Sequence, residues 1–286
     1  MVLRGETDPH QVGAFLMLLR YRGEDAEEVA GLVEAAREVM GAGLPPGCPA
    51  VALDWPSYGA GRTRGAPWFL LAALALARAG HRVLMHGSNE FTRGTPVTEA
   101  LGALGLPVCT SREEAAAQLG GTGFAYLPLA TLCPRFDGLL RLRGLLGLRS
   151  PVNTVARLLN PFDAPASVDG VFHPPYIALH LNAAALLNRQ RLVVVKGGGG
   201  EAERSPAKPM TAHWLDAEAG RGEHALPALP PQDGPEELVA TWRDGTGPGA
   251  RTAQATIALG LLALGQATDP AAADAQATAV WAGRLG

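Results

Sequence analysis

Short apolar runs alternate with helix-like stretches through most of this chain, and this alternation constrains its fold more than any other feature. Strand-like runs lie at 50–54, 82–85, 124–127, 168–172 and 192–196, with a shorter one near Val108. Helical patterns separate them at 67–79, 96–104, 111–118 and 174–188. Strands that alternate with helices are typical of βαβ units and a parallel sheet. We therefore predict an α/β fold with a mainly parallel central sheet.

Helices dominate the two ends of the chain. Residues 8–20 predict a helix, because Asp8 can cap it, Pro9 suits its first position and Val12, Phe15, Leu16 and Leu19 share one face. A second helix is expected at 24–40, before a glycine- and proline-rich linker at 41–47. Further helices are expected at 130–148, 235–242, 250–265 and 270–285, and loops with short edge strands at 204–234. The sequence thus predicts a small helical unit beside a larger α/β unit.

Composition excludes several classes of protein. A net charge of −3 over 286 residues leaves no overall basic footprint for nucleic acid. The three cysteines have no metal-ligand spacing, so we expect buried free thiols. The N-terminus lacks the apolar core of a signal peptide, and the longest apolar run, Ala66–Ala77, is shorter than the ~20 residues that span a bilayer. We expect a cytoplasmic protein without membrane contact.

A glycine-rich loop at 54–67 joins the first strand to its helix. Gly59 and Gly61 allow close backbone approach, and Arg62 and Arg64 add positive charge. Backbone N–H groups at a helix N-terminus favour an anion. An ordinary strand–helix connection can have the same composition, so both interpretations remain open at this point.

Polar residues follow three of the predicted strands. The carboxyl ends of parallel strands form the edge at which open α/β sheets bind ligands. The candidate phosphate or donor ligands are Ser57, Gly59, Gly61, Arg62, Arg64, His86, Gly87, Ser88, Thr92, Arg93 and Thr95. Glu201 and Glu203 are candidate ligands for Mg²⁺, unless they form a solvated hairpin tip. This set suits a phosphorylated sugar.

Several segments resemble the anthranilate phosphoribosyltransferase family, the family-3 glycosyltransferases that include pyrimidine nucleoside phosphorylases. The resemblance lies in Gly5–Arg20, in His86-Gly87, in Gly147-Leu-Arg-Ser-Pro-Val-Asn153, in Leu158-Leu-Asn-Pro161 and in Val171-Phe-His-Pro174. The segments follow in family order from about Gly5 to Arg284.

The resemblance implies a helical domain of residues 1–46, joined by the 130–148 helix, beside an α/β domain of 47–129 and 149–286. It implies a cleft between the domains, a homodimer formed through the helical domain, and a donor like phosphoribosyl pyrophosphate with Mg²⁺. The family has at least one more helix before the segment that matches Gly5. Either the helical domain is trimmed or the start lies upstream.

Departures from the family pattern concentrate at the phosphate loop. The family's Gly-Thr-Gly-Gly-Asp-Gly falls on residues 57–62, where only Gly59 matches, and its Asn-Ile-Ser-Thr falls on Pro67-Trp-Phe-Leu70. The family has a lysine where this chain has Met85, and a pair of arginines where it has Arg143 and Gly144. Of the family's Asp-Glu pair, which binds the metal, only the glutamate is kept, as Glu203. The sequence resembles a branch of the family that has a Pro-Ser-Tyr loop at this position, and some members of that branch bind nucleic acid without sequence preference.

Two stretches are locally basic, each with five arginines and one acidic residue: 62–93 and 135–157. Candidate contacts for an acceptor or for nucleic acid are Arg135, Arg141, Arg143 and Asn153, although Arg141 and Arg143 also fit a solvated helix face. Two functions follow. One is a transferase that binds a phosphoribosyl pyrophosphate-like donor but is not a true anthranilate phosphoribosyltransferase. The alternative is a non-catalytic protein that binds the DNA or RNA backbone without sequence preference.

Overall fold

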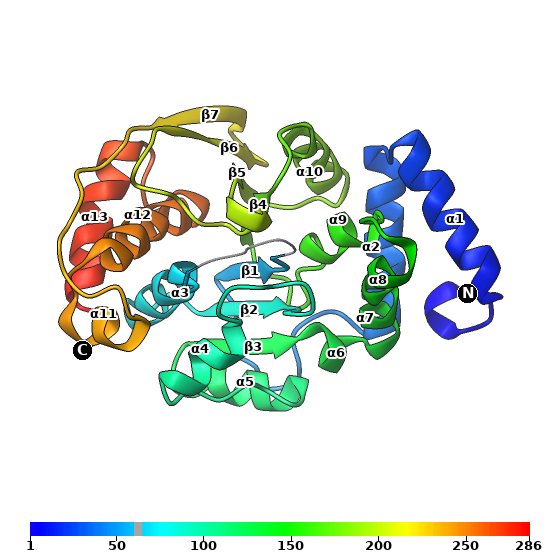
Figure 1. The fold of residues 1–286 in the computed structure, drawn as a ribbon, viewed down its shortest axis with the longest axis horizontal. Coiled ribbons are helices and arrows are strands. Elements are labelled where there is room, and N and C mark those ends of the chain that lie inside the picture. Colours follow the sequence, from blue (N-terminus) through cyan, green and yellow to red (C-terminus); the bar gives the residue numbers. More distant parts are fainter. Residues whose placement is uncertain (60–64) are drawn as a thin grey trace.

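One seven-stranded sheet forms the centre of the computed structural model, which describes residues 1–59 and 65–286 (Figure 1). The strands are β1 (Leu53–Ser57), β2 (Val83–Gly87), β3 (Phe124–Pro128), β4 (Ala166–Val171), β5 (Arg191–Lys196), β6 (Met210–Asp216) and β7 (Gly220–Leu226). Their order is β3-β2-β1-β4-β5-β6-β7, in which β6 pairs antiparallel with β5 and with β7 and the other pairs are parallel. The predicted fold class, with its mainly parallel sheet, is confirmed.

The order of strands reverses at β1. From β1 the chain adds β2 and β3 on one side, and it then returns to place β4 on the other side. Leu53 of β1 therefore lies between Val83 of β2 and Ala166 of β4. A crevice at such a switch point, outside the carboxyl ends of the strands, is the usual ligand site of an open α/β sheet.

One face of the sheet is covered by α3 (Trp68–Arg78), α12 (Pro248–Ala263) and α13 (Pro270–Ala282), with α11 (Leu238–Asp244) beside them (Figure 1). Every residue of α3 from Phe69 to Ala77 is buried. Gly260 of α12 permits close contact with α3, because a Cβ there would lie 2.4 Å from Leu76 Cδ1. This side of the fold is a continuous apolar core that holds the start of α3 firmly.

The N-terminal helices pack on the opposite side of the molecule (Figure 1). Asp8 caps α1 (Pro9–Arg22), and Asp25 and Glu28 form a capping box at α2 (Ala26–Met40). Helix α2 packs against α9 (Val152–Arg157) and α10 (Pro175–Leu186). The small helical domain is confirmed, while its boundaries at 1–46 and 130–148 stay a prediction. Further short helices include η1 (Val2–Arg4), α4 (Val97–Ala103), α5 (Arg112–Gly121) and η2 (Gly198–Gly200).

The prediction of a single helix at 130–148 is wrong. The segment forms three short helices, α6 (Leu129–Leu132), α7 (Pro134–Arg141) and α8 (Arg143–Leu146). Pro134 has no N–H to give to the preceding turn, and it holds Cys133 in an extended conformation. The strand expected near Val108 is also absent from the described residues, where Cys109 N–H makes a single bond to Tyr126 O.

The side chains test two further predictions, the buried face of α1 and the state of the cysteines. Phe15 does not share the buried face of α1 with Val12, Leu16 and Leu19, because its side chain is 45% exposed. All three cysteines are free thiols, and Cys109 and Cys133 are buried. Across residues 1–59 and 65–286, no helix combines the length and apolar character that a membrane crossing needs.

Candidate functional site

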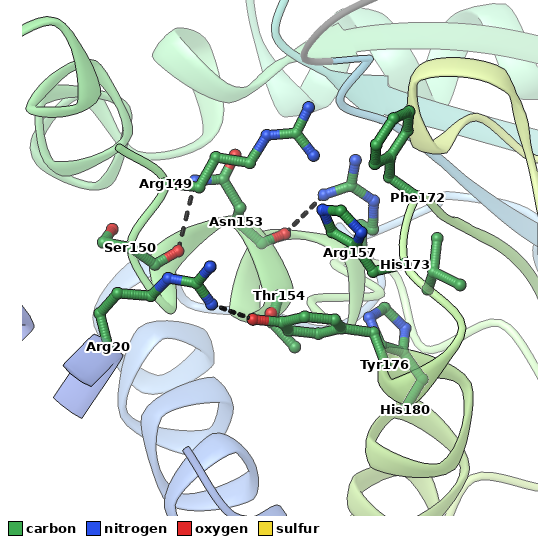
Figure 2. Close-up of a pocket in the computed structure, with 11 residues that line it drawn as sticks. Arg20, Arg149, Ser150, Asn153, Thr154, Arg157, Phe172, His173, Tyr176 and His180 are labelled. Carbon is green, nitrogen blue, oxygen red and sulfur yellow. Dashed lines mark hydrogen bonds between the residues drawn. The ribbon is translucent and has the colours of Figure 1, made fainter. Parts of the chain in front are cut away.

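A cavity of about 200 Å³ lies at the carboxyl end of β4, between α9, α10 and α1 (Figure 2). Its lining comes from both the helical and the α/β parts of the chain: Arg20, Arg149, Ser150, Asn153, Thr154, Arg157, Val171, Phe172, His173, Tyr176 and His180. The cavity therefore lies next to the switch point, where the strand order predicts a ligand.

Arg149 gives this cavity its positive charge. Its guanidinium makes no hydrogen bond or ion pair within the described residues and lies 5.5 Å from the centre of the Phe172 ring. Burial lowers the pKa of Arg149 to about 10, and the positive charges of Arg143, Arg157 and Arg20 contribute to this lowering. The group stays protonated at neutral pH, and it repels the neighbouring positive charges of Arg143, Arg157 and Arg20. A bound anion would relieve that repulsion.

The positive charge continues outside the cavity. Arg143 lies 4.6 Å above the Phe91 ring, and its Nη1 is buried without a hydrogen-bond partner. Burial lowers the pKa of Arg143, and the nearby charge of exposed Arg93 adds to the effect. We call Arg20, Arg149, Arg143 and Arg93 the arginine ridge. No carboxylate of the described chain forms an ion pair with any of these four.

Arg157 forms the floor of the cavity and joins the segments around it (Figure 2). Its buried guanidinium donates to Gly170 O of β4 at 3.0 Å, to Asn153 O of α9 at 2.7 Å and to Tyr58 O after β1 at 2.8 Å. Burial lowers its pKa, and the negative charge of Glu201 opposes that effect. One side chain thus fixes the two strands of the switch point against α9.

His86, a predicted donor contact, lies in the protein interior. Its Nδ1 is 2.8 Å from Tyr58 Oη, and its Nε2 is 3.3 Å from Asp54 Oδ1. Burial raises the pKa of Tyr58 well above its usual value, so the phenol stays protonated and forms a hydrogen bond with Nδ1. All three side chains are almost inaccessible to solvent, so the trio supports the strand ends and does not line the cavity.

Replacing Tyr58 with phenylalanine is expected to lower the free energy of unfolding by about 2 kcal/mol, because His86 Nδ1 would lose its buried partner. Urea denaturation followed by circular dichroism measures this change. Tyr21→Phe is the matched control, since Tyr21 is 93% exposed. Equal stability of the two variants would mean that the buried hydrogen bond contributes nothing.

The predicted metal ligands lie at the expected sheet edge but contact the chain itself. Ser57 Oγ donates to Glu201 Oε1 at 3.2 Å, and a Cβ at Gly59 would lie 2.2 Å from the same oxygen. Glu203 Oε2 accepts the backbone N–H of Phe69 at 3.0 Å. Three or more His, Cys, Asp or Glu side chains do not gather into a possible metal site anywhere in the described chain.

The loop after β2 packs on the end of β1. Thr92 Oγ1 donates to Gly59 O at 2.8 Å, Ser88 N donates to Ser57 O at 3.1 Å, and Thr95 N donates to Gly65 O. A Cβ at Gly87 would lie 1.9 Å from Ser57 O, so only glycine allows this approach. The predicted residues Gly61, Arg62 and Arg64 lie outside the described residues.

The predicted arginine contacts separate into different environments. Arg143 joins the ridge, and Asn153 lines the cavity. Arg141 instead pairs with Glu90 and with Asp137, beside a second, polar cavity that contains Gly87 and Ser88. Arg135 is exposed and lies against Gly5 at the end of η1.

Sequence reasoning missed most of the residues that line the cavity, including Arg20, Arg149 and Phe172. Arg20 and Arg149 both lie in segments that carry the family resemblance, which was a usable signal.

Comparisons with known proteins agree with this architecture. Residues 1–40 match the helical bundle domain of a glycosyl transferase family, and residues 69–229 match its α/β domain. The chain is 30% identical to the anthranilate phosphoribosyltransferase of Nitratidesulfovibrio vulgaris over 85% of this chain and 73% of that protein. It is 31% identical to the Oleidesulfovibrio alaskensis enzyme over 73% of this chain, but spans only 62% of that relative.

Solved structures share the fold. The anthranilate phosphoribosyltransferase of Thermus thermophilus has a TM-score of 0.78 and 25% identity, covering 99% of this chain and 88% of that one. The Saccharomyces cerevisiae enzyme, solved in complex with PRPP and Mg, has a TM-score of 0.74 and 17% identity, covering 99% and 86%.

Proposed function

The chain belongs to this glycosyl transferase family, and from that premise we propose that it binds single-stranded nucleic acid along the arginine ridge without sequence preference. The observation that carries the proposal is the set of four neighbouring arginines without a carboxylate partner among the described residues. A protein with a net charge of −3 keeps this local excess of cations at its interdomain cavity.

Aromatic rings alternate with these cations. Phe91 lies beneath Arg143, and Phe172, which is 44% exposed, lies beneath Arg149. Proteins that bind single strands without sequence preference combine a cationic path for the backbone with aromatic surfaces on which bases stack. The ridge supplies both, and Arg143 and Arg93 extend the cationic path beyond the cavity.

Fluorescence anisotropy with labelled single-stranded DNA tests the proposal. We expect similar affinities for oligonucleotides of equal length and different sequence, because the ridge contacts phosphates and stacking is tolerant of sequence. Calorimetry with phosphoribosyl pyrophosphate and Mg²⁺ is the parallel experiment. Donor binding without any DNA binding would overturn the proposal.

A second candidate is a phosphoribosyl transferase that uses a phosphoribosyl pyrophosphate-like donor with Mg²⁺. Ser57, Gly59, Thr92 and Glu201 converge at the end of β1, which favours a small ligand there. The departures at Met85 and Gly144 argue against anthranilate as its acceptor. Release of pyrophosphate from the donor in a coupled assay would support this candidate.

We also propose a homodimer through α1. Phe15, Leu18 and Tyr21 place apolar and aromatic surface in solvent on one short helix, with exposures of 45%, 68% and 93%. An exposed apolar patch of this kind marks an interface. A cytoplasmic location stays a prediction.

Leu18→Glu is expected to convert the dimer into a monomer, because it places a charge in the centre of the α1 patch. Light scattering after size exclusion measures the mass. Leu186→Glu on α10 is the control, since Leu186 is also exposed but lies outside α1. A wild-type chain of monomeric mass would contradict the proposed interface.

A further inference from the structure

The first turn of α3 has no N–H left for a ligand. Trp68 N donates to Ala66 O at 3.0 Å, and Leu70 N donates to Pro67 O at 2.9 Å. Between them, Phe69 N donates to the carboxylate of Glu203 at 3.0 Å. The N-cap residue is Pro67, whose side chain has no acceptor, so the acceptor comes from a segment 134 positions away. A negative group therefore already occupies the positive end of this helix.

The segment that carries Glu203 is fixed in place. The next residue, Arg204, is fully buried, and its guanidinium binds Asp274 of α13 and Pro227 O. Arg204 N also donates to Thr256 Oγ1 of α12 at 3.0 Å. Because α12 and α13 pack against the sheet face that also holds α3, the carboxylate and the helix end belong to one rigid unit.

We propose that Glu203 is an internal anion that takes the place of a phosphate at the N-terminal end of α3 and excludes diphosphate esters from that helix end. A diphosphate there would meet the like charge of Glu203 and would find no backbone donor in the first turn. Trp68, Phe69 and Leu70 offer no side-chain donor to replace those backbone groups, apart from the indole N–H of Trp68, whose ring packs on Gly249.

The two carboxylates that the family resemblance assigns to Mg²⁺ are each engaged with the chain itself. Mg²⁺ requires near-octahedral oxygen ligands and usually binds through carboxylates and substrate phosphates. Here one oxygen of Glu201 accepts from Ser57, and one oxygen of Glu203 accepts from Phe69. In the described part of the chain, no cluster of three possible ligands forms around them. Glu203 is thus a specificity-determining residue that acts by exclusion. This inference does not depend on nucleic-acid binding by the ridge, and it counts against the second candidate function, a transferase that uses a diphosphate donor.

Thermal unfolding with inorganic pyrophosphate tests the proposal. All variants carry Arg143→Ala and Arg149→Ala, so that the arginine ridge binds the anion more weakly and equally in every variant. With Glu203 intact, we expect no change of Tm with pyrophosphate, whether Mg²⁺ is present or not. With Glu203→Ala, we expect a Tm lower by several degrees, because the helix end loses its anion, and recovery of several degrees on adding pyrophosphate without Mg²⁺.

Two variants complete the experiment. Glu203→Gln keeps an acceptor for Phe69 N and removes the charge, so it should fold even if Glu203→Ala does not, and pyrophosphate should raise its Tm by a smaller amount. Glu218→Ala removes an exposed carboxylate in the turn between β6 and β7 and should leave the response unchanged. A Mg²⁺-dependent rise of Tm with Glu203 intact, lost in both variants, would overturn the proposal. So would a lack of response to pyrophosphate in both Glu203 variants.

Discussion

Replacing both Arg143 and Arg149 with alanine is expected to weaken the binding of single-stranded DNA by about 100-fold. Each arginine can make a charge-assisted hydrogen bond to a phosphate, and such bonds contribute about 1.5 kcal/mol or more. Two of them correspond to about two orders of magnitude in Kd. Neither guanidinium has an ion pair to lose in the described protein, so the folded state should keep its stability. Fluorescence anisotropy at fixed salt measures the change.

The matched control removes two arginines that already have carboxylate partners. Arg191 pairs with Asp216, and Arg243 pairs with Asp244. The double variant Arg191→Ala with Arg243→Ala changes the net charge by the same amount but leaves the ridge intact. It should change the affinity by less than about threefold, because exposed ion pairs contribute little. Equal losses in the two double variants would mean that total charge, and not the ridge, governs binding.

Replacing Arg157 with alanine is expected to lower the free energy of unfolding by about 4 kcal/mol. The side chain satisfies the carbonyl oxygens of Gly170, Asn153 and Tyr58 in a place that excludes water. Each buried acceptor that loses its partner costs about 1–3 kcal/mol. The nearby carboxylate of Glu201 would also lose its favourable interaction with the charge of Arg157. Urea denaturation followed by circular dichroism measures the loss.

Arg93→Ala separates this structural role from binding. Arg93 is exposed, so its removal should change stability by less than about 0.5 kcal/mol while it weakens DNA binding. If Arg157→Ala were no less stable than Arg93→Ala, the hydrogen bonds of Arg157 would not hold the switch point together.

The fold could be predicted from the sequence because its main elements are strongly periodic. All five parallel strands follow apolar runs, and their alternation with helices predicts a parallel sheet whose carboxyl-end edge binds ligands. The broken helix at 130–148 escaped prediction because its apolar spacing stays helical across Pro134. In that segment, local backbone chemistry overrode the periodicity.

Strand ends were harder to predict than strand centres. β1 was expected at 50–54 and runs from Leu53 to Ser57, although it contains Pro56. Pairing with β2 continues through Pro56 and Ser57, opposite His86 and Gly87. The polar side chains that suggested a loop are buried there because they bind one another, as His86 does with Tyr58. The sequence alone does not reveal these hydrogen bonds, because the partners lie far apart in the chain.

The candidate site was predicted only in outline for the same reason. Ser57, Gly59, Thr92 and Glu201 do converge, as their positions after parallel strands suggested. Whether a charged side chain is free or engaged depends on distant partners, however. Arg141 is neutralised by Glu90 and Asp137, while Arg143, two residues later, has no carboxylate partner in the described structure.

The salt dependence of single-stranded DNA binding tests the central claim most directly. Each phosphate contact made by an arginine releases a counterion and contributes about −0.7 to the slope of log K against log salt concentration. The four arginines of the ridge therefore predict a slope of about −3 per protomer, falling by about half in the Arg143→Ala, Arg149→Ala variant. A slope near zero, or a slope that the double variant leaves unchanged, would contradict the account.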